Sequence, residues 1–154
     1  MIDYDNFQKS LKRLEEQYKN YQAFDESLPD VTQEAIAESV VRRFKTCYDF
    51  SWKVLKRYLI EDLGLADVPN SPKGIFRLAH ENNLFASPLE DWLRYADTRL
   101  FKNHSPLEGE SARQGRSPQP RRWGDKQQAC LKLTGNFIDD AIDLYQTMSG
   151  ETWE

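Results

Sequence analysis

The run QEAIAESVVRRFKTCYDFSWKVLKRYLIEDL, residues 33–63, decides the fold of this chain. Its apolar residues recur at spacings of three and four, which is typical of an α-helix. Asp30 or Thr32 stands where an N-cap is expected, and Gly64 stands where helices commonly end. The pattern predicts one long helix, which would span roughly 45 Å at ~1.5 Å per residue.

The apolar positions of this run cover more than one stripe of the predicted helix. They are Ile36, Val40, Phe44, Cys47, Trp52, Leu55, Tyr58 and Leu59. A helix that is apolar over so wide an arc has more than one neighbour. We therefore expect the long helix to pack inside its own bundle and against a second copy of the chain, which predicts a homodimer.

Helical spacing of apolar residues recurs on both sides of this run. Ser71-Pro72 and Ser87-Pro88 each indicate an N-cap followed by proline in the first turn, and Glu90 completes a capping box with the second pair. No segment shows strand alternation bounded by hairpin turns. The fold class is therefore predicted to be all-α, an up-and-down bundle of four to five helices. The further helices are expected at about 4–21, 72–82, 89–99 and 125–148.

The whole chain, residues 1–154, has the length of one domain of ordinary size. An apolar content of 39% and a charged content of 30% exclude a disordered chain. No apolar run approaches the ~20 residues of a membrane span, and the opening MIDYDNFQKS lacks the layout of a signal peptide. A cytoplasmic protein without membrane contact is expected. The net charge of -4 argues against general attraction to nucleic acid and leaves a local basic site open.

The two cysteines and two histidines of the chain show no metal-ligand spacing. Cys47 and Cys130 are far apart in sequence and sit inside helical patterns, so we expect two buried free thiols. His80 is expected to be a surface or half-buried residue of a short helix. The sequence therefore predicts neither a metal nor another cofactor.

One stretch, SPLEGESARQGRSPQPRRWG at residues 105–124, departs from the helical scheme. It holds three of the seven glycines and three of the seven prolines of the chain, together with four arginines. This composition cannot form a packed core and predicts a mobile inserted loop. Two interpretations remain open, an arginine-bearing arm that contacts phosphate and a solvated insertion without a role.

Arg99 and His104 form a pattern, R-x-x-x-x-H, that suits metal-free cleavage of RNA. On a continuous helix they would point roughly 140° apart, so convergence requires the helix to end between them, as Asn103 and Ser105-Pro106 permit. The arginine can hold a phosphate bidentately, and the histidine can act as general base or acid. A symmetric dimer with two facing copies would supply both roles. Chance spacing is the alternative.

Four blocks of the sequence carry a resemblance to a known family. They are VVRRFKTCYDFSWKVLKRYL at 40–59, NSPKGIFRLAHENNLF at 70–85, WLRYADTR at 92–99 and FIDDAIDLYQTMSGETWE at 137–154. With these blocks, the chain outside residues 105–124 is similar to the nucleotidyltransferase substrate-binding family of the HEPN (higher eukaryote and prokaryote nucleotide-binding) superfamily. The resemblance implies a dimeric up-and-down bundle and a minimal nucleotidyltransferase as partner.

The resemblance also implies an activity. Such proteins resemble toxins that cleave RNA through an arginine and a histidine, which Arg99 and His104 match by position. The partner transferase resembles an antitoxin that adenylylates a tyrosine two residues after the histidine, and this chain has Pro106 there. In the family the residue after the arginine is often polar, whereas this chain has Leu100 there. We infer that foreign coding sequence was inserted near the motif, and whether His104 belongs to the insertion stays open.

The expected function is a HEPN-type component of a toxin–antitoxin pair with a minimal nucleotidyltransferase. Its ancestral activity is metal-independent endoribonuclease cleavage at the dimer interface, and two outcomes for this copy, weakened or inactive, follow from the departures near the motif. The alternative is a non-catalytic subunit that binds substrate or nucleotide for the transferase. A third interpretation is a helical dimer whose role is partner binding alone.

Overall fold

The computed structural model describes residues 2–23, 27–100 and 120–153, with the side chains of residues 120–126 excepted. This part of the chain contains helices and no strands, which confirms the predicted all-α bundle. None of these helices combines the length and the apolar content needed to cross a membrane. The helices are α1 (Asp5–Ala23), α2 (Asp30–Glu61), α3 (Pro72–Glu81), α4 (Leu89–Arg99) and α6 (Pro120–Ser149).

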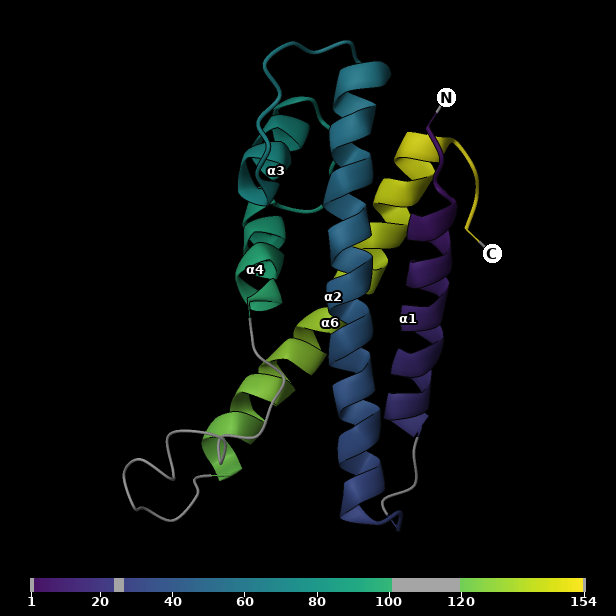
Figure 1. The fold of residues 1–154 in the computed structure, drawn as a ribbon, viewed down its shortest axis with the longest axis vertical. Helices are drawn as coiled ribbons and strands as arrows, with labels where there is room; N and C mark the ends of the chain where they lie inside the picture. Colours follow the sequence, from purple (N-terminus) through teal and green to yellow (C-terminus); the bar gives the residue numbers. More distant parts are fainter. Residues whose placement is uncertain (1, 24–26, 101–119, 154) are drawn as a thin grey trace.

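The longest helix, α2, is the axis of the bundle. Figure 1 shows α2 between α1 on one side and the α3–α4 pair on the other, with α6 crossing behind it. All four of these helices contact α2. Val40, Phe44 and Leu55 are fully buried in this way. The wide apolar arc is thus used within the chain's own bundle, and its part in a homodimer stays a prediction.

The sequence predicted the C-terminal end of α2 correctly and its N-terminal cap wrongly. The helix begins at Asp30, and its N-cap is Pro29, which makes no side-chain capping bond, so the predicted caps Asp30 and Thr32 are wrong. At the other end Gly64 has φ +64°, the left-handed conformation that only glycine adopts without strain. The amide of Leu65 then bonds the carbonyl of Leu59 at 3.1 Å and closes the last turn.

The two proline start signals also differ in outcome. Ser71 is the N-cap of α3, where its hydroxyl accepts from the amide of Gly74 at 3.3 Å, as predicted. The N-cap of α4 is Pro88, and no side chain caps it. The Ser87 hydroxyl accepts instead from the indole N–H of Trp92 at 3.1 Å. The predicted capping box is therefore wrong, because the buried indole takes the capping oxygen.

The last helix begins earlier than its apolar pattern indicates. α6 starts at Pro120, five residues before the predicted start at Asp125. A proline fits the first turn of a helix because its missing N–H would have no intrahelical partner there. Residues 120–124 are therefore helical rather than part of the predicted inserted loop. The remainder of that loop, 105–119, lies outside the described residues.

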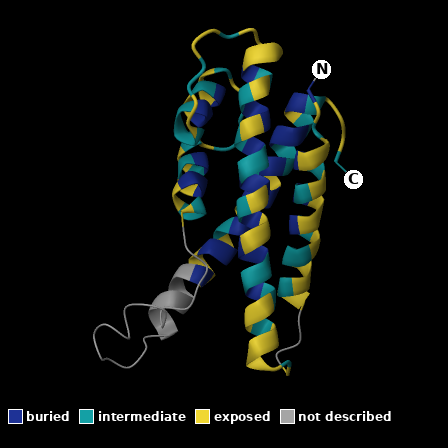
Figure 2. Cartoon of the chain, in the orientation of Figure 1, coloured by how far each residue is buried: buried dark blue, intermediate teal, exposed yellow. Residues whose placement is uncertain are grey.

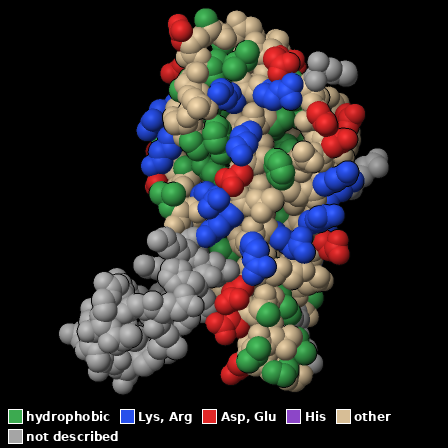
Figure 3. All heavy atoms as spheres, viewed as in Figure 1, with side chains coloured by type: hydrophobic (Ala, Val, Ile, Leu, Met, Phe, Trp, Pro, Cys, Tyr) green, Lys and Arg blue, Asp and Glu red, His purple; other side chains and the backbone are tan. Residues whose placement is uncertain are grey.

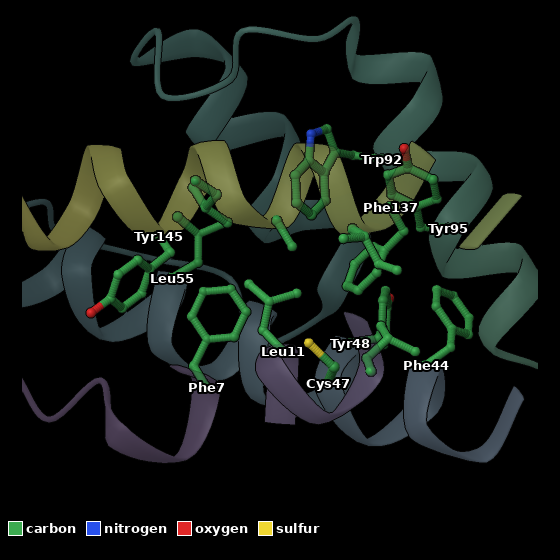
Figure 4. Close-up of a cluster of buried hydrophobic side chains, with 14 of the residues drawn as sticks. Phe7, Leu11, Phe44, Cys47, Tyr48, Leu55, Trp92, Tyr95, Phe137 and Tyr145 are labelled. Atoms are coloured by element: carbon green, nitrogen blue, oxygen red, sulfur yellow. The ribbon is translucent and has the colours of Figure 1, made fainter. Parts of the chain in front are cut away.

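An aromatic cluster fills the centre of the bundle. Figure 2 shows buried residues along the helices, and Figure 4 shows the rings that meet in this cluster. Phe137 packs edge-on against Phe44 and Tyr95, with ring centroids 5.0 and 5.2 Å apart. Cys47 and Cys130 are free and buried in this core, which confirms the expectation for both thiols. The core thereby fixes α4 and α6 against α2.

Candidate functional site

The predicted phosphate-binding residue, Arg99, lies in the last turn of α4 and is held by a carboxylate of α2. Its Nε donates to Asp49 Oδ1 and its Nη2 to Oδ2, each at 3.0 Å. The two side chains are 34% and 36% exposed, so the pair lies at the boundary between core and solvent. These hydrogen bonds from the guanidinium to Asp49 raise the pKa of Arg99 above its ordinary value.

The packing of α4 explains why Arg99 points at α2. Trp92 and Tyr95 are buried on the inner face of α4, and Tyr95 donates a hydrogen bond to Asp140 of α6. Arg99 follows Tyr95 by four residues and therefore lies on nearly the same face of the helix. Because Arg99 stands in the last turn of α4, its positive charge also lies at the negative end of the helix dipole.

A second cation, Lys45, lies one helical turn before Asp49 on α2. Burial lowers the pKa of Lys45, and the nearby positive charge of Arg99 lowers it further. Its side chain is half-buried. The site therefore combines two cations with one carboxylate, and the carboxylate is bound by the arginine.

The two histidines take no described part in this site. His104, the second residue of the predicted motif, lies outside the described residues. His80 is exposed on α3, in agreement with its expected surface position. Across the described ranges, no three His, Cys, Asp or Glu side chains are grouped closely enough to hold a metal ion.

Asp49 was missed in the sequence, and no sequence signal identifies it. The residue is one of many acidic residues on a charged helix, and its partner lies 50 positions away. Only the packing of α4 on α2 joins the two. Asp49 lies four positions after Lys45, and this spacing would suggest at most an ion pair within one helix.

The arrangement leaves hydrogen-bonding capacity on Arg99. A guanidinium has five N–H donors, of which the pair with Asp49 uses two. The remaining donors can bind a phosphate oxygen, while the carboxylate fixes the plane of the guanidinium group. The same carboxylate offsets the positive charge, which weakens long-range attraction of an anion. The geometry therefore suits a positioned arginine that binds phosphate at close range.

Comparison with known proteins gives a family and a similar structure. A family model described as nucleotidyltransferase substrate binding protein like matches residues 2–105. A crystal structure of a protein from Thermus Thermophilus is similar, with 26% sequence identity and a TM-score of 0.51, over 86% of this chain and 98% of that chain. No curated protein matches the sequence. Because the family model covers α1 to α4 and more than half of the chain, the chain belongs to the nucleotidyltransferase substrate binding protein-like family.

Proposed function

We propose that this chain is the HEPN-type component of a toxin–antitoxin pair with a minimal nucleotidyltransferase, and that it cleaves RNA without a metal through Arg99 and His104. The observation that carries the proposal is the extent of the family match. It ends at residue 105 and so includes both residues of the motif. A match that reaches past His104 supports this histidine as a family position rather than part of an insertion.

The held geometry of Arg99 supports a role in binding phosphate. Asp49 fixes the guanidinium plane, and the donors that it leaves free would bind an RNA phosphate, whose charge grows during cleavage. His104 would take the proton from the 2′-hydroxyl or give one to the leaving oxygen. Because one histidine does not serve both roles at once, the mechanism requires two copies of the site in a homodimer. Such a dimer should bury at least ~1,000 Å².

A second function, a non-catalytic subunit that binds substrate or nucleotide for the transferase, is favoured by one observation. The Asp49 carboxylate already offsets the charge of Arg99, so the pair is close to neutral. A neutral pair needs no anionic ligand and serves as a structural link between α2 and α4. Under this second proposal the transferase alone performs the chemistry.

Purified protein with single-stranded RNA in EDTA tests the first proposal. General acid–base help is typically worth ~10²–10⁴-fold in rate, so His104→Ala should slow cleavage by about that factor. His80→Ala is the matched control, because His80 is exposed on α3 and should leave the rate unchanged. Equal cleavage by wild type and His104→Ala contradicts the assignment. Absence of cleavage by a wild-type protein that binds the transferase favours the subunit.

A further inference from the structure

A groove of about 480 Å³ lies between α1 and α2, within the size range of small-ligand pockets. It is separate from the Arg99–Asp49 pair, because it opens on the side of α2 that faces α1, whereas Arg99 reaches α2 from α4. Four cations line it, Lys9 and Arg13 from α1 and Arg42 and Arg43 from α2. Figure 3 shows Lys and Arg side chains gathered over these two helices.

The four cations have no acidic partner inside the groove. No Asp or Glu lines it, and none of its four cations forms a salt bridge with a described residue. Lys9 and Arg13 lie four residues apart on one helix face, a spacing at which like charges destabilise a helix. On the other side of the groove, Arg42 and Arg43 are neighbours in the sequence of α2. An anion bound between the helices would relieve the repulsion among all four.

Two of the remaining polar groups of the groove can donate hydrogen bonds to a ligand. The hydroxyls of Ser10 and Thr46 are not among them, because they already donate to the carbonyls of Phe7 and Arg42, at 2.9 and 3.2 Å. The amide group of Asn6 and the hydroxyl of Ser39 add to the N–H groups of the four cations. A multiply charged oxyanion matches this set, because it accepts hydrogen bonds at every oxygen and carries enough charge for four cations.

We propose that the α1–α2 groove binds a ligand with two or more linked phosphate groups. A single carboxylate or phosphate would leave part of the positive charge uncompensated, whereas a phosphate chain carries more charge and could contact cations of both helices. Such a chain occurs free or attached to a nucleoside. Phe50, half-buried in the lining, supplies an aromatic surface on which a base can stack. The inference does not rest on the proposed RNA cleavage, since it uses neither Arg99 nor His104.

Isothermal titration calorimetry of the full chain with inorganic tripolyphosphate, in EDTA and at low ionic strength, tests the site. Hydrogen bonds to charged groups are among the stronger ones, so Arg13→Gln and Arg42→Gln should each weaken binding about tenfold or more. Arg77→Gln is the matched control, because it removes one exposed positive charge from α3, across α2 from the groove. It should leave the dissociation constant within about twofold, and circular dichroism should be unchanged in all three variants.

ATP and adenosine distinguish the two sources of the phosphate chain. ATP binding as tightly as tripolyphosphate identifies the phosphate chain as the recognised group, and tighter ATP binding that Phe50→Ala removes identifies a nucleoside phosphate. Adenosine should not bind. Lack of saturable binding of both anions overturns the proposal, and so does equal weakening by Arg13→Gln and Arg77→Gln. Saturable binding of single-stranded RNA without any binding of tripolyphosphate also overturns it, in favour of a nucleic-acid surface.

Discussion

The guanidinium of Arg99 and the carboxylate of Asp49 form two parallel hydrogen bonds that join the last turn of α4 to the middle of α2. The pair fixes the orientation of Arg99 just before the chain reaches His104. Because Asp49 orients Arg99, it also takes part in any chemistry that Arg99 performs. A change in either residue should therefore affect the rate of RNA cleavage more than it affects the free energy of unfolding.

Asp49→Asn should lower the free energy of unfolding only slightly. Both side chains are about one third exposed, and ion pairs in such positions contribute about 0–1 kcal/mol. The melting temperature should fall by no more than about 4 °C, and the fall should shrink at high salt. Asp91→Asn, which breaks the exposed pair with Arg94, is the control and should cost less. A loss above about 3 kcal/mol would show that the pair is integral to the fold.

Trp92→Ala should be severely destabilising. Trp92 is 1% exposed, stacks on Phe85 with ring centroids 4.4 Å apart, and donates its indole N–H to Ser87. Removal of a buried aromatic side chain costs about 3–5 kcal/mol, which urea unfolding measures. Trp52→Ala on α2 removes the same atoms from a half-buried position and should cost clearly less. Equal losses for the two tryptophans would contradict the position of Trp92 at the core centre.

Both cysteines should be unreactive in the folded protein. Burial raises the pKa of the Cys47 thiol to about 12 and that of Cys130 to about 11. The thiolate is the reactive form, so native protein at about pH 8 should react with a thiol reagent at neither position within minutes. After unfolding in guanidinium chloride, both should react. Rapid labelling of one thiol in the native state would show that its helix opens locally.

The free energy of unfolding should fall in alkaline solution. The folded-state pKa of Cys47 is above the unfolded value of about 8.5, so the unfolded chain releases this proton first as the pH rises. The contribution is fully present below about pH 8.5 and is lost as the pH rises toward about 12. Urea unfolding between about pH 8 and about pH 10.5 should show the decline, with a shallower slope in Cys47→Ala. The same slope in both proteins would assign the effect to other groups.

The sequence was sufficient for the elements whose signals are local. The start of α3 at Ser71-Pro72 and the left-handed Gly64 after α2 depend only on neighbouring residues, and both are as predicted. The start of α4 at Leu89 is also as predicted, but its capping is not, because the hydroxyl of Ser87 accepts from the indole of Trp92, five residues away, instead of from a backbone amide. Local rules fail where a buried side chain takes the capping group.

The site was harder to predict than the fold because it depends on tertiary packing. Arg99 could be singled out from its spacing to a histidine, but its partner Asp49 is brought to it only by the packing of α4 on α2. The groove cations Arg13 and Arg42 stand on two helices, so the sequence shows them as ordinary surface charges. Charge clusters that form across helices are visible only once the helices are placed.

The most direct test of the account is the rate of RNA cleavage in EDTA by Arg99→Lys beside Arg94→Lys. Lysine lacks the planar fork that binds Asp49 and a phosphate together, so Arg99→Lys should cleave at least about tenfold more slowly. Arg94 is exposed one turn earlier on α4, and Arg94→Lys should cleave at the wild-type rate. Equal rates for the two variants and the wild type would contradict the assignment of Arg99 to the RNA-cleaving site.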